Sequence, residues 1–442
     1  MKLDLHPTVK LVKKKATTVR PAMDAAKLRA LCLEAGADDV GFVALDRDEV
    51  RDQRDEILSV LPGAKTLVSF VVRMNRDDIR SPARSMANLE FHHTNDAIND
   101  VGRAIVRALL DHGHRAVLPS AGFPMEMDRF PGKTWLVSHK PIAVAAGLGA
   151  MGIHRNVIHP QFGNFILLGT VVTDLAWAAD EASTPLDYNP CLECKLCVAA
   201  CPVGAIGSDG HFDFSACYTH NYREFMGGFT DWVENIADAA NARDYRARVS
   251  DSESASMWQS LSFGANYKAA YCLAVCPAGE DVIGPFLSSR KDFTAQVVRP
   301  LQDKVEPIYV TAKSDAEAYV AKRFPHKRIR RVNSGLRVNS IEALIRGMPL
   351  RFQRGQSDGL AARYHFSFHG SERVDLTVDI RDHVLTIERG LAGEADVHVT
   401  ADAEVWLATL RRDKSLFWAL LTRRVRVRGK LTLLRRFGAC FP

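Results

Sequence analysis

The sequence predicts an α/β domain over residues 1–175, a cysteine-rich module over 176–295 and an α+β domain over 339–442. A basic linker over 296–338 is expected between the last two parts. Three observations lead to this division. Apolar β-branched runs alternate with amphipathic helical patterns in the first part, seven of the nine cysteines lie in the second, and the third alternates apolar and polar residues with a period of two.

The first part contains the elements of a layered α/β domain. Asp24 can cap a helix that runs to residue 35, where Gly36 ends it. The other expected elements are strands over 40–45, 66–72, 116–118 and 165–172 and a helix over 95–112. The runs 66–72 and 165–172 consist largely of apolar and β-branched residues, which predicts strands that are buried on both faces.

The cysteines of the middle part form two groups with the spacing of iron–sulfur ligands. The first group reads C-x2-C-x2-C-x3-C-P and consists of Cys191, Cys194, Cys197 and Cys201. The second group consists of Cys217, Cys272 and Cys276. This is the spacing of bacterial two-cluster ferredoxins, in which the fourth cysteine of a run serves the other cluster. A zinc site would favour paired C-x2-C knuckles and disulfides would need an oxidising compartment, so we predict two iron–sulfur clusters. The insertion between Cys217 and Cys272 is expected to be helical.

The net charge of +6 is modest and spread along the chain, so it does not by itself indicate nucleic-acid binding. Its densest patches lie at 10–15, 322–331 and 423–436. Such runs are usually solvated faces, and binding to an anion or a membrane surface is the alternative. The N-terminus lacks the apolar segment of a secretory signal, and the longest apolar run, 165–172, is too short to span a bilayer. We expect a cytoplasmic protein without a transmembrane segment.

A glycine-rich stretch precedes the last strand of the α/β domain. It reads AGLGAMGIHRN over 146–156 and is followed by HPQFGNFILLGTVVTD. Glycines at this spacing let a backbone approach a ligand closely. The pattern lacks the preceding strand and the downstream acidic residue of a dinucleotide fingerprint, so nicotinamide binding is not expected.

Together with the cysteine run, these segments resemble the superfamily of epoxyqueuosine reductase and the reductive dehalogenases. The likeness extends from about residue 25 to residue 295. It implies a nitroreductase-like α/β domain that holds cobalamin, and two iron–sulfur clusters that supply electrons to this cofactor. By the resemblance, the cobalamin-binding residues are Gly147, Gly149, Gly152, Arg155, Asn156 and Gly163.

The chain departs from the family at the expected proton donor. Epoxyqueuosine reductase has an aspartate in the strand before the glycine stretch, and Ser138 stands there in this chain. His139 and Lys140 lie at the same place and are our candidate catalytic residues, because histidine and lysine can supply protons near neutral pH. His92 and His93 are further candidates, with a capping or surface role before the helix 95–112 as the alternative.

Two family features are missing from the sequence. The helical-repeat tail with which epoxyqueuosine reductase binds tRNA has no counterpart, so neither epoxyqueuosine nor a nucleic-acid partner is expected. The export signal of respiratory dehalogenases is also missing, which argues against a membrane-linked respiratory role.

The second cysteine group is one ligand short of the family's pattern. By that pattern, one complete cluster is held by Cys191, Cys194, Cys197 and Cys276. The other keeps Cys201, Cys217 and Cys272, because Ala269 stands where the family has a cysteine. The incomplete site would hold a 3Fe–4S cluster, or a 4Fe–4S cluster with a non-cysteine ligand. His220 is the nearest candidate ligand, and a position beside the cluster or at the surface is the alternative.

The final part resembles the lipid-binding domain of sterol carrier proteins. Matching segments include SIEALIRGMPLRFQ, VDLTVDIRDHVLTIERG and TRRVRVRGKL. The resemblance implies an apolar tunnel between a sheet and helices for a lipid or another hydrophobic ligand. Four apolar residues could line the tunnel or belong to the core, and the core is the simpler expectation: Phe417, Trp418, Leu420 and Leu421.

These observations predict an iron–sulfur, cobalamin-dependent reductase that cleaves a carbon–oxygen or carbon–halogen bond in a small, hydrophobic substrate. A reduced ferredoxin or flavodoxin would be the electron donor. Two alternatives stay open: an electron-transfer protein without a corrinoid, and a module that reduces or delivers cobalamin.

Overall fold

The computed structural model describes residues 3–15, 23–130, 132–176, 183–411 and 413–442. Its first domain is built on an antiparallel sheet with the strand order β1-β2-β6-β3. The strands are β1 (Asp39–Ala44), β2 (Thr66–Arg73), β3 (Ala116–Val117) and β6 (Ile166–Thr173). A separate two-stranded ribbon in the glycine stretch is formed by β4 (Ala150–Met151) and β5 (Val157–Ile158).

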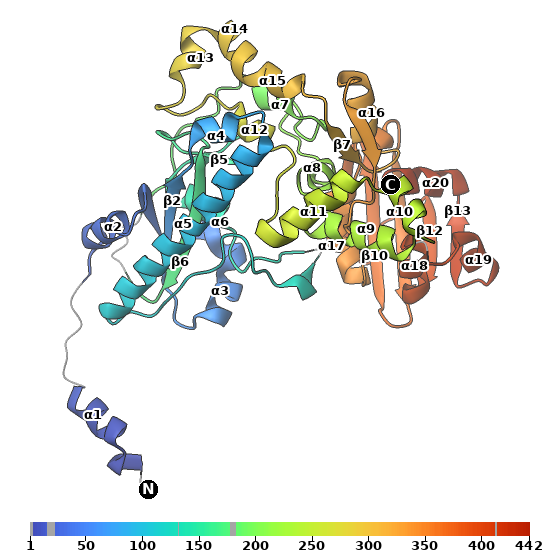
Figure 1. Ribbon diagram of the computed structural model, residues 1–442. Helices are drawn as coiled ribbons and strands as arrows, with labels where there is room; N and C mark the ends of the chain where they lie inside the picture. Colours follow the sequence, from blue (N-terminus) through green and yellow to red (C-terminus); the bar gives the residue numbers. More distant parts are fainter. Residues whose placement is uncertain (1–2, 16–22, 131, 177–182, 412) are drawn as a thin grey trace.

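Helices cover both faces of the main sheet (Figure 1). The helices of this domain are α1 (Pro7–Lys15), α2 (Ala25–Glu34), α3 (Arg54–Val60), α4 (Arg76–Arg80), α5 (Arg84–Asp111) and α6 (His139–Ala145). The first face, which carries Phe70, packs against α2 and α5, and the opposite face, which carries Val71, packs against α3 and α6. Successive strand residues point to opposite faces, so β2 is mostly apolar because both of its faces are buried up to its last residue, the exposed Arg73.

Two expectations for this domain were wrong in detail. The long helix begins at Arg84 instead of residue 95, because no glycine or proline interrupts 84–94. His92 and His93 therefore lie inside α5 and cannot cap it. Ser138 lies at the start of a helix, not in a strand, since α6 begins at His139.

The cysteine-rich module consists of short helices. They are α7 (Leu196–Ala200), α8 (Phe214–Asn221), α9 (Met226–Ala237), α10 (Ala242–Arg248), α11 (Asp251–Phe263), α12 (Tyr271–Ala274), α13 (Gly284–Ser288), α14 (Arg290–Phe293) and α15 (Arg299–Gln302). A π-helical turn, Thr294–Val298, precedes α15. The insertion between Cys217 and Cys272 is helical, as expected, and buried Arg223 pairs with Asp231 of α9 and Glu253 of α11 at 2.8 and 3.1 Å.

The segment expected to be a linker over 296–338 is a folded unit. Strands β7 (Pro307–Val310) and β8 (Arg328–Arg331) pair in parallel and are joined by α16 (Asp315–Arg323). Ile308 and Val320 are buried in the same core as the cysteine module. Basic residues dominate the sequence of this segment, but its spaced apolar residues are sufficient to bury one face.

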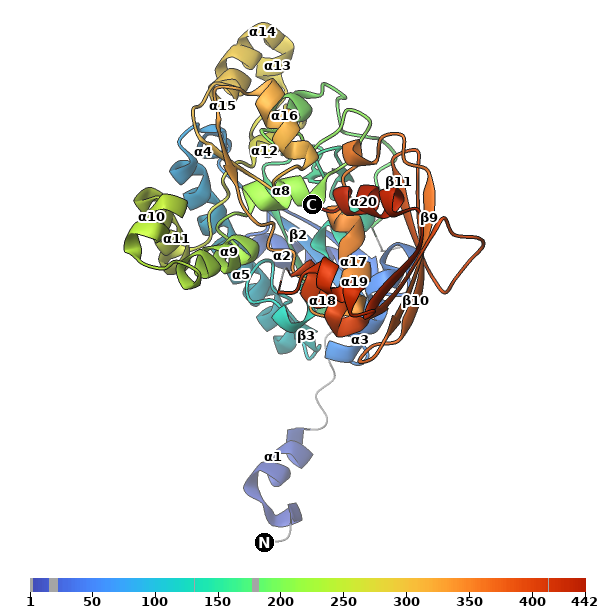
Figure 2. The same cartoon turned by 90° about the vertical axis from the view of Figure 1, so that its right-hand side faces the viewer.

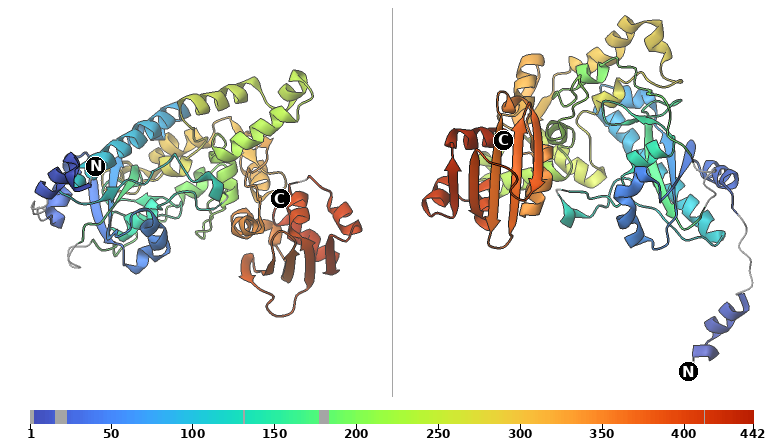
Figure 3. Two further views of the ribbon diagram at one scale, coloured as in Figure 1. Left: turned by 90° about the horizontal axis from the view of Figure 1, so that it is seen from below. Right: turned by 180° about the vertical axis from the view of Figure 1, so that it is seen from behind.

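The final domain is a five-stranded sheet with the order β11-β10-β9-β12-β13 and helices on one face (Figure 2). Its strands are β9 (Ala362–His369), β10 (Val374–Arg381), β11 (Val384–Arg389), β12 (Val397–Asp402) and β13 (Val425–Gly429). Its helices are α17 (Ile341–Arg351), α18 (Ala403–Leu410), α19 (Leu416–Leu421) and α20 (Leu431–Ala439). The other face of the sheet is uncovered in the right-hand view of Figure 3.

Three features of this domain differ from the expectation. The sheet is mixed, because β12 runs parallel to β9. Helix α20 was not anticipated. Phe417 and Trp418 are exposed instead of buried in the core, because rings from β9 and α20, such as Phe366 and Phe437 with centroids 5.3 Å apart, already fill the space under the sheet.

Candidate iron–sulfur site

The two cysteine segments of the module have the same local backbone. Lys195 precedes α7 and Ala270 precedes α12, and both residues have a left-handed backbone with φ of 57° and 54°. A cysteine–proline pair follows each helix. The two segments therefore have the same order of elements. Ala269 is the counterpart of Cys194, since each lies directly before the left-handed residue.

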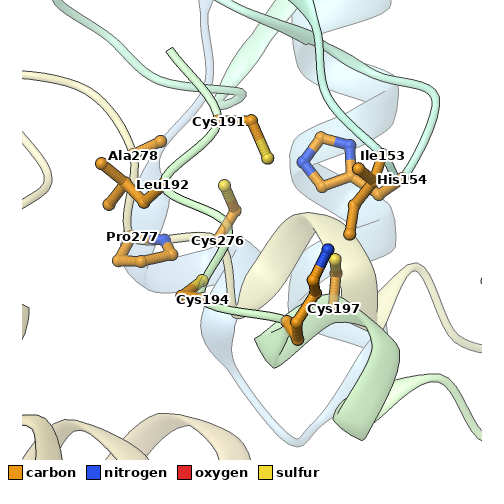
Figure 4. Close-up of a pocket in the computed structure, with 10 residues that line it drawn as sticks. Ile153, His154, Cys191, Leu192, Cys194, Cys197, Cys276, Pro277 and Ala278 are labelled. Atoms are coloured by element: carbon orange, nitrogen blue, oxygen red, sulfur yellow. The ribbon is translucent and has the colours of Figure 1, made fainter. Parts of the chain in front are cut away.

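Four cysteines surround one cavity, in which Ile153 and His154 from the glycine stretch also take part (Figure 4). The cysteines are Cys191, Cys194, Cys197 and Cys276. This is the complete ligand set expected from the family pattern, and a 4Fe–4S cluster needs four such thiolates. Within the ranges that the structure describes, no three His, Cys, Asp or Glu side chains form a group around a single metal ion.

The remaining three cysteines also lie together. Burial raises the pKa of Cys217 well above its usual value, and the nearby Cys272 and Cys201 raise it further. Burial raises the pKa of Cys272 to about 12, again with a contribution from Cys201. These thiols form the incomplete three-cysteine site, next to Ala269. Three thiols suit an iron–sulfur cluster in which one iron position has no cysteine ligand.

The two cysteine sites adjoin each other. Burial raises the pKa of Cys197, which belongs to the four-cysteine site, and Cys272 of the three-cysteine site is the next cause. Because these thiols are near enough to affect each other electrostatically, the two clusters that they hold would lie close together. Electron transfer between the clusters requires such a short distance.

His220 is buried on α8, one helical turn after Cys217, but its hydrogen bonding argues against ligation. Its Nδ1 accepts a hydrogen bond of 3.3 Å from the backbone N–H of Tyr309. The proton of the neutral ring must then be on Nε2, which has no partner among the described groups. Burial lowers the pKa of His220 to about 3, so the ring is neutral. A histidine that binds iron through Nε2 normally carries its proton on Nδ1, so an N–H donor beside the cluster fits His220 better.

The glycines expected to bind cobalamin pack against the protein itself. A Cβ at Gly147 would lie 2.3 Å from the Thr184 carbonyl oxygen, and one at Gly149 would lie 2.5 Å from that of Ile158. At Gly163 the distance to the Ala278 carbonyl oxygen would be 2.1 Å. Backbone packing therefore explains why these positions require glycine.

The other three predicted cofactor residues also contact protein groups. Gly152 lies against the ring of His154, Arg155 donates to the Gly210 carbonyl oxygen at 3.1 Å, and Asn156 accepts from the Lys140 ammonium at 3.1 Å. The six residues do not form a cradle that a corrinoid would fill. Their role in cobalamin binding stays a prediction without support from these contacts.

The structure separates the two candidate proton donors. His139 has both ring nitrogens engaged, with Thr170 Oγ1 at 2.9 Å and the Ser120 carbonyl oxygen at 3.1 Å. Lys140 is exposed and donates to the Arg155 carbonyl oxygen at 2.6 Å. Surrounding protein lowers the pKa of Lys140 by desolvation, while Cys272 and Cys217 act in the opposite direction. Lys140 is thus accessible beside the three-cysteine site, whereas His139 holds α6 to its neighbours.

Aromatic residues around the three-cysteine site were missed as site residues by the sequence reasoning. Tyr222 and Tyr267 form an edge-to-face pair with ring centroids 5.5 Å apart. Burial raises the pKa of Tyr222 well above its usual value, and Tyr267, Cys217 and Cys272 contribute to this shift. Tyr267 could have been found from the sequence, because it lies only two residues before Ala269. The rings continue to Phe91 of α5, 4.8 Å from Tyr267.

Comparisons with known proteins support the cysteine assignment. The 4Fe–4S binding domain family matches residues 184–207, which include the first cysteine group. An epoxyqueuosine reductase of Vibrio cholerae serotype O1 is 31% identical over 91 residues, 21% of this chain and 24% of the relative. A second, from Synechococcus sp., is 29% identical over 171 residues, 37% of this chain and 48% of the relative. Over these segments the chain is similar to epoxyqueuosine reductases. It spans about a quarter to a half of the length of these relatives.

Two solved structures are similar to parts of this chain. An epoxyqueuosine reductase bound to an epoxyqueuosine-modified tRNA stem loop has 19% identity and a TM-score of 0.33, and the match covers 44% of this chain and 56% of that one. A reductive dehalogenase has 15% identity and a TM-score of 0.38, over 67% and 37% of the respective chains. The first of these reductases binds a tRNA stem loop; for this chain, the absence of a nucleic-acid partner stays an untested prediction.

The described helices include none that is both long and apolar enough to cross a membrane. The likeness of residues 339–442 to sterol carrier proteins remains a prediction.

Proposed function

We propose that this chain is an iron–sulfur reductase with a four-iron cluster at the four-cysteine site and a second cluster at the three-cysteine site. The observation that carries the proposal is the gathering of seven cysteines, distant in sequence, into two adjoining groups. When bound, such clusters accept and donate single electrons. The named relatives, which are reductases, support the same reaction class.

In this proposal, the substrate binds beside Lys140 and the three-cysteine site. Lys140 is accessible there and its ammonium lies within electrostatic reach of Cys217 and Cys272. Tyr222 and Tyr267 supply apolar ring surface, which suits a hydrophobic substrate. Reductive cleavage of a carbon–oxygen or carbon–halogen bond consumes two electrons and one proton per substrate, and releases the oxygen or halide as an anion. In this proposal Lys140 delivers the proton to carbon.

Electrons would enter at the four-cysteine site. The segment that carries its first cysteines is close to the surface, since Leu192 is exposed between Cys191 and Cys194. A reduced ferredoxin or flavodoxin is the electron donor in this proposal, because it delivers one electron at a time. We derive no step through cobalamin, because the glycine stretch offers it no cradle.

The test starts with anaerobic purification from cells supplied with iron, sulfide and cobalamin, followed by iron, zinc and cobalt analysis and low-temperature EPR. Two reducible iron–sulfur centres are expected. Zinc in place of iron, or one centre only, would overturn the proposal. Turnover of halogenated or epoxide compounds with a reduced ferredoxin then separates a reductase from a protein that only transfers electrons, and stoichiometric cobalt would restore the cobalamin prediction.

A further inference from the structure

Helix α19 carries four large apolar side chains that the fold leaves in solvent. Phe417, Trp418 and Leu421 are exposed by 71%, 62% and 62%, and Leu416 by 40%. We call these four residues the α19 surface. Exposed apolar side chains are common singly, but a contiguous group of this size usually marks an interaction site.

The helix is nevertheless firmly attached to its domain. Ala419 is buried in the domain core, and Leu420 packs against that core. The Trp418 carbonyl oxygen accepts hydrogen bonds from the N–H and hydroxyl of Thr422 at the end of the helix. The α19 surface is therefore a fixed feature that the buried side of the helix holds outward.

Basic side chains flank both ends of the α19 surface. Lys414 precedes the helix, and Arg423 and Arg424 follow it; all three are exposed. None of the three forms an ion pair with any residue that the structure describes. Among the described residues, Arg411, further upstream, pairs only with Asp413, at 2.9 Å. The surroundings of the α19 surface therefore carry a positive charge that the protein leaves largely uncompensated.

We propose that the α19 surface docks the protein on an anionic lipid bilayer. Aromatic and leucine side chains of an interfacial helix enter the boundary between headgroups and acyl chains, and tryptophan favours that depth. Exposed lysine and arginine at its ends then lie at the level of anionic headgroups. An anionic bilayer thus binds both parts of the surface: its apolar centre and its basic flanks.

Other partners would satisfy only one of these properties. A second copy of the chain would cover the apolar side chains, but a two-fold contact places the same patch on both sides and so brings Arg423 and Arg424 near their own copies. A nucleic acid would pair with the arginines but leave Phe417 and Leu421 in water. The surface lies at the outer edge of the C-terminal domain, remote from the α/β domain (Figure 1), so a flat bilayer can reach it.

The experiment is cosedimentation of the full chain with phosphatidylcholine vesicles, with and without phosphatidylglycerol. We expect binding that is roughly tenfold stronger to the anionic vesicles and that weakens as salt is added. The double variant Phe417→Ser/Trp418→Ser should lose most of the binding. So should Arg423→Glu/Arg424→Glu, while far-UV circular dichroism and thermal unfolding stay as in the parent protein.

Two matched variants control for composition. Trp258→Ser/Phe263→Ser removes an exposed tryptophan–phenylalanine pair from α11, and Lys322→Glu/Arg323→Glu reverses an exposed basic pair on α16. Both should bind vesicles like the parent. The proposal is overturned by equal binding to neutral and anionic vesicles, by equal losses in the controls, by a dimer that only the α19 variants dissolve, or by binding to RNA but not to vesicles.

Discussion

The side chain of Asn221 holds the backbone of Ala269. Its Oδ1 accepts a hydrogen bond of 3.1 Å from the Ala269 N–H and one of 2.8 Å from the Ala270 N–H. Asn221 is the last residue of the helix that carries Cys217. The bond therefore fixes the loop in a ligand-bearing conformation at a position that has no thiol. The missing ligand is a property of one side chain, not of the loop.

Ala269→Cys should complete the three-cysteine site. The new thiol would occupy the place that Cys194 has in the other segment, so both clusters should hold four irons. In the parent protein, oxidation should release iron from the incomplete corner and produce the EPR signal of a three-iron cluster. The variant should retain its iron under the same treatment.

Ala269→Ser is the matched control, because it adds the same number of heavy atoms without a thiol. It should behave like the parent protein. If the parent already keeps four irons at both sites after oxidation, a protein ligand must fill the corner. His220→Gln would then identify or exclude histidine.

Cys194→Ala should reproduce the gap at the other site. Because Lys195 and Ala270 share a left-handed backbone, removal of the Cys194 thiol leaves the first segment equivalent to the second. A second oxidation-sensitive centre should then appear in quantitative EPR. Complete loss of the first cluster instead would show that the two loops are not equivalent.

Lys140→Met should lower turnover by about 100-fold, the usual effect of removing a general acid. The iron content and the EPR spectra should not change, because Lys140 is no cluster ligand. His139→Gln is the comparison: both nitrogens of His139 are bonded to Thr170 and Ser120, so its loss should lower the unfolding temperature more than turnover. If His139→Gln instead lowers the single-turnover rate more than Lys140→Met does, His139 is the proton donor.

Gly163→Ala should destabilise the four-cysteine site. Gly163 has φ of +64°, and a Cβ there would meet the Ala278 carbonyl oxygen, two residues after Cys276. We expect a loss of about 1–3 kcal/mol in unfolding free energy and a lower iron content. Gly63→Ala is the control, since Gly63 also has a positive φ of +88° but nothing lies within 4 Å; it should cost about 1 kcal/mol and leave the iron unchanged.

Asp213 should make stability depend on pH. Burial raises its pKa to about 6 from the ordinary 3.8, and Asp315 adds to the shift. The native state then binds the proton more tightly than the unfolded state, so the unfolding free energy falls as pH rises from about 4 to about 6. Asp213→Asn keeps an acceptor for the Ala216 N–H but does not titrate. Urea unfolding at pH 5 and pH 7.5 should therefore favour the variant more at the higher pH, and an equal difference at both would contradict this.

The cysteine ligands could be predicted because their spacing is a local property. The run from Cys191 to Cys201 permits few other uses, and the family pattern supplied Cys276 from far along the chain. The strands 66–72 and 165–172 were equally clear, since continuous apolar runs have no place at a surface. Residues 296–338 were misjudged because their basic residues conceal an apolar spacing that only packing against the module explains.

What the sequence by itself determined is the chemistry: seven thiols in two groups, the gap at Ala269, and a lysine before a glycine stretch. Only the tertiary structure decided which groups meet. It brings Lys140 beside Cys217 and Cys272, bonds both nitrogens of His139, and turns Phe417 and Trp418 outward. The physical reason is that ligand spacing is set by a few adjacent residues, whereas accessibility and pairing depend on packing between segments that lie far apart in the chain.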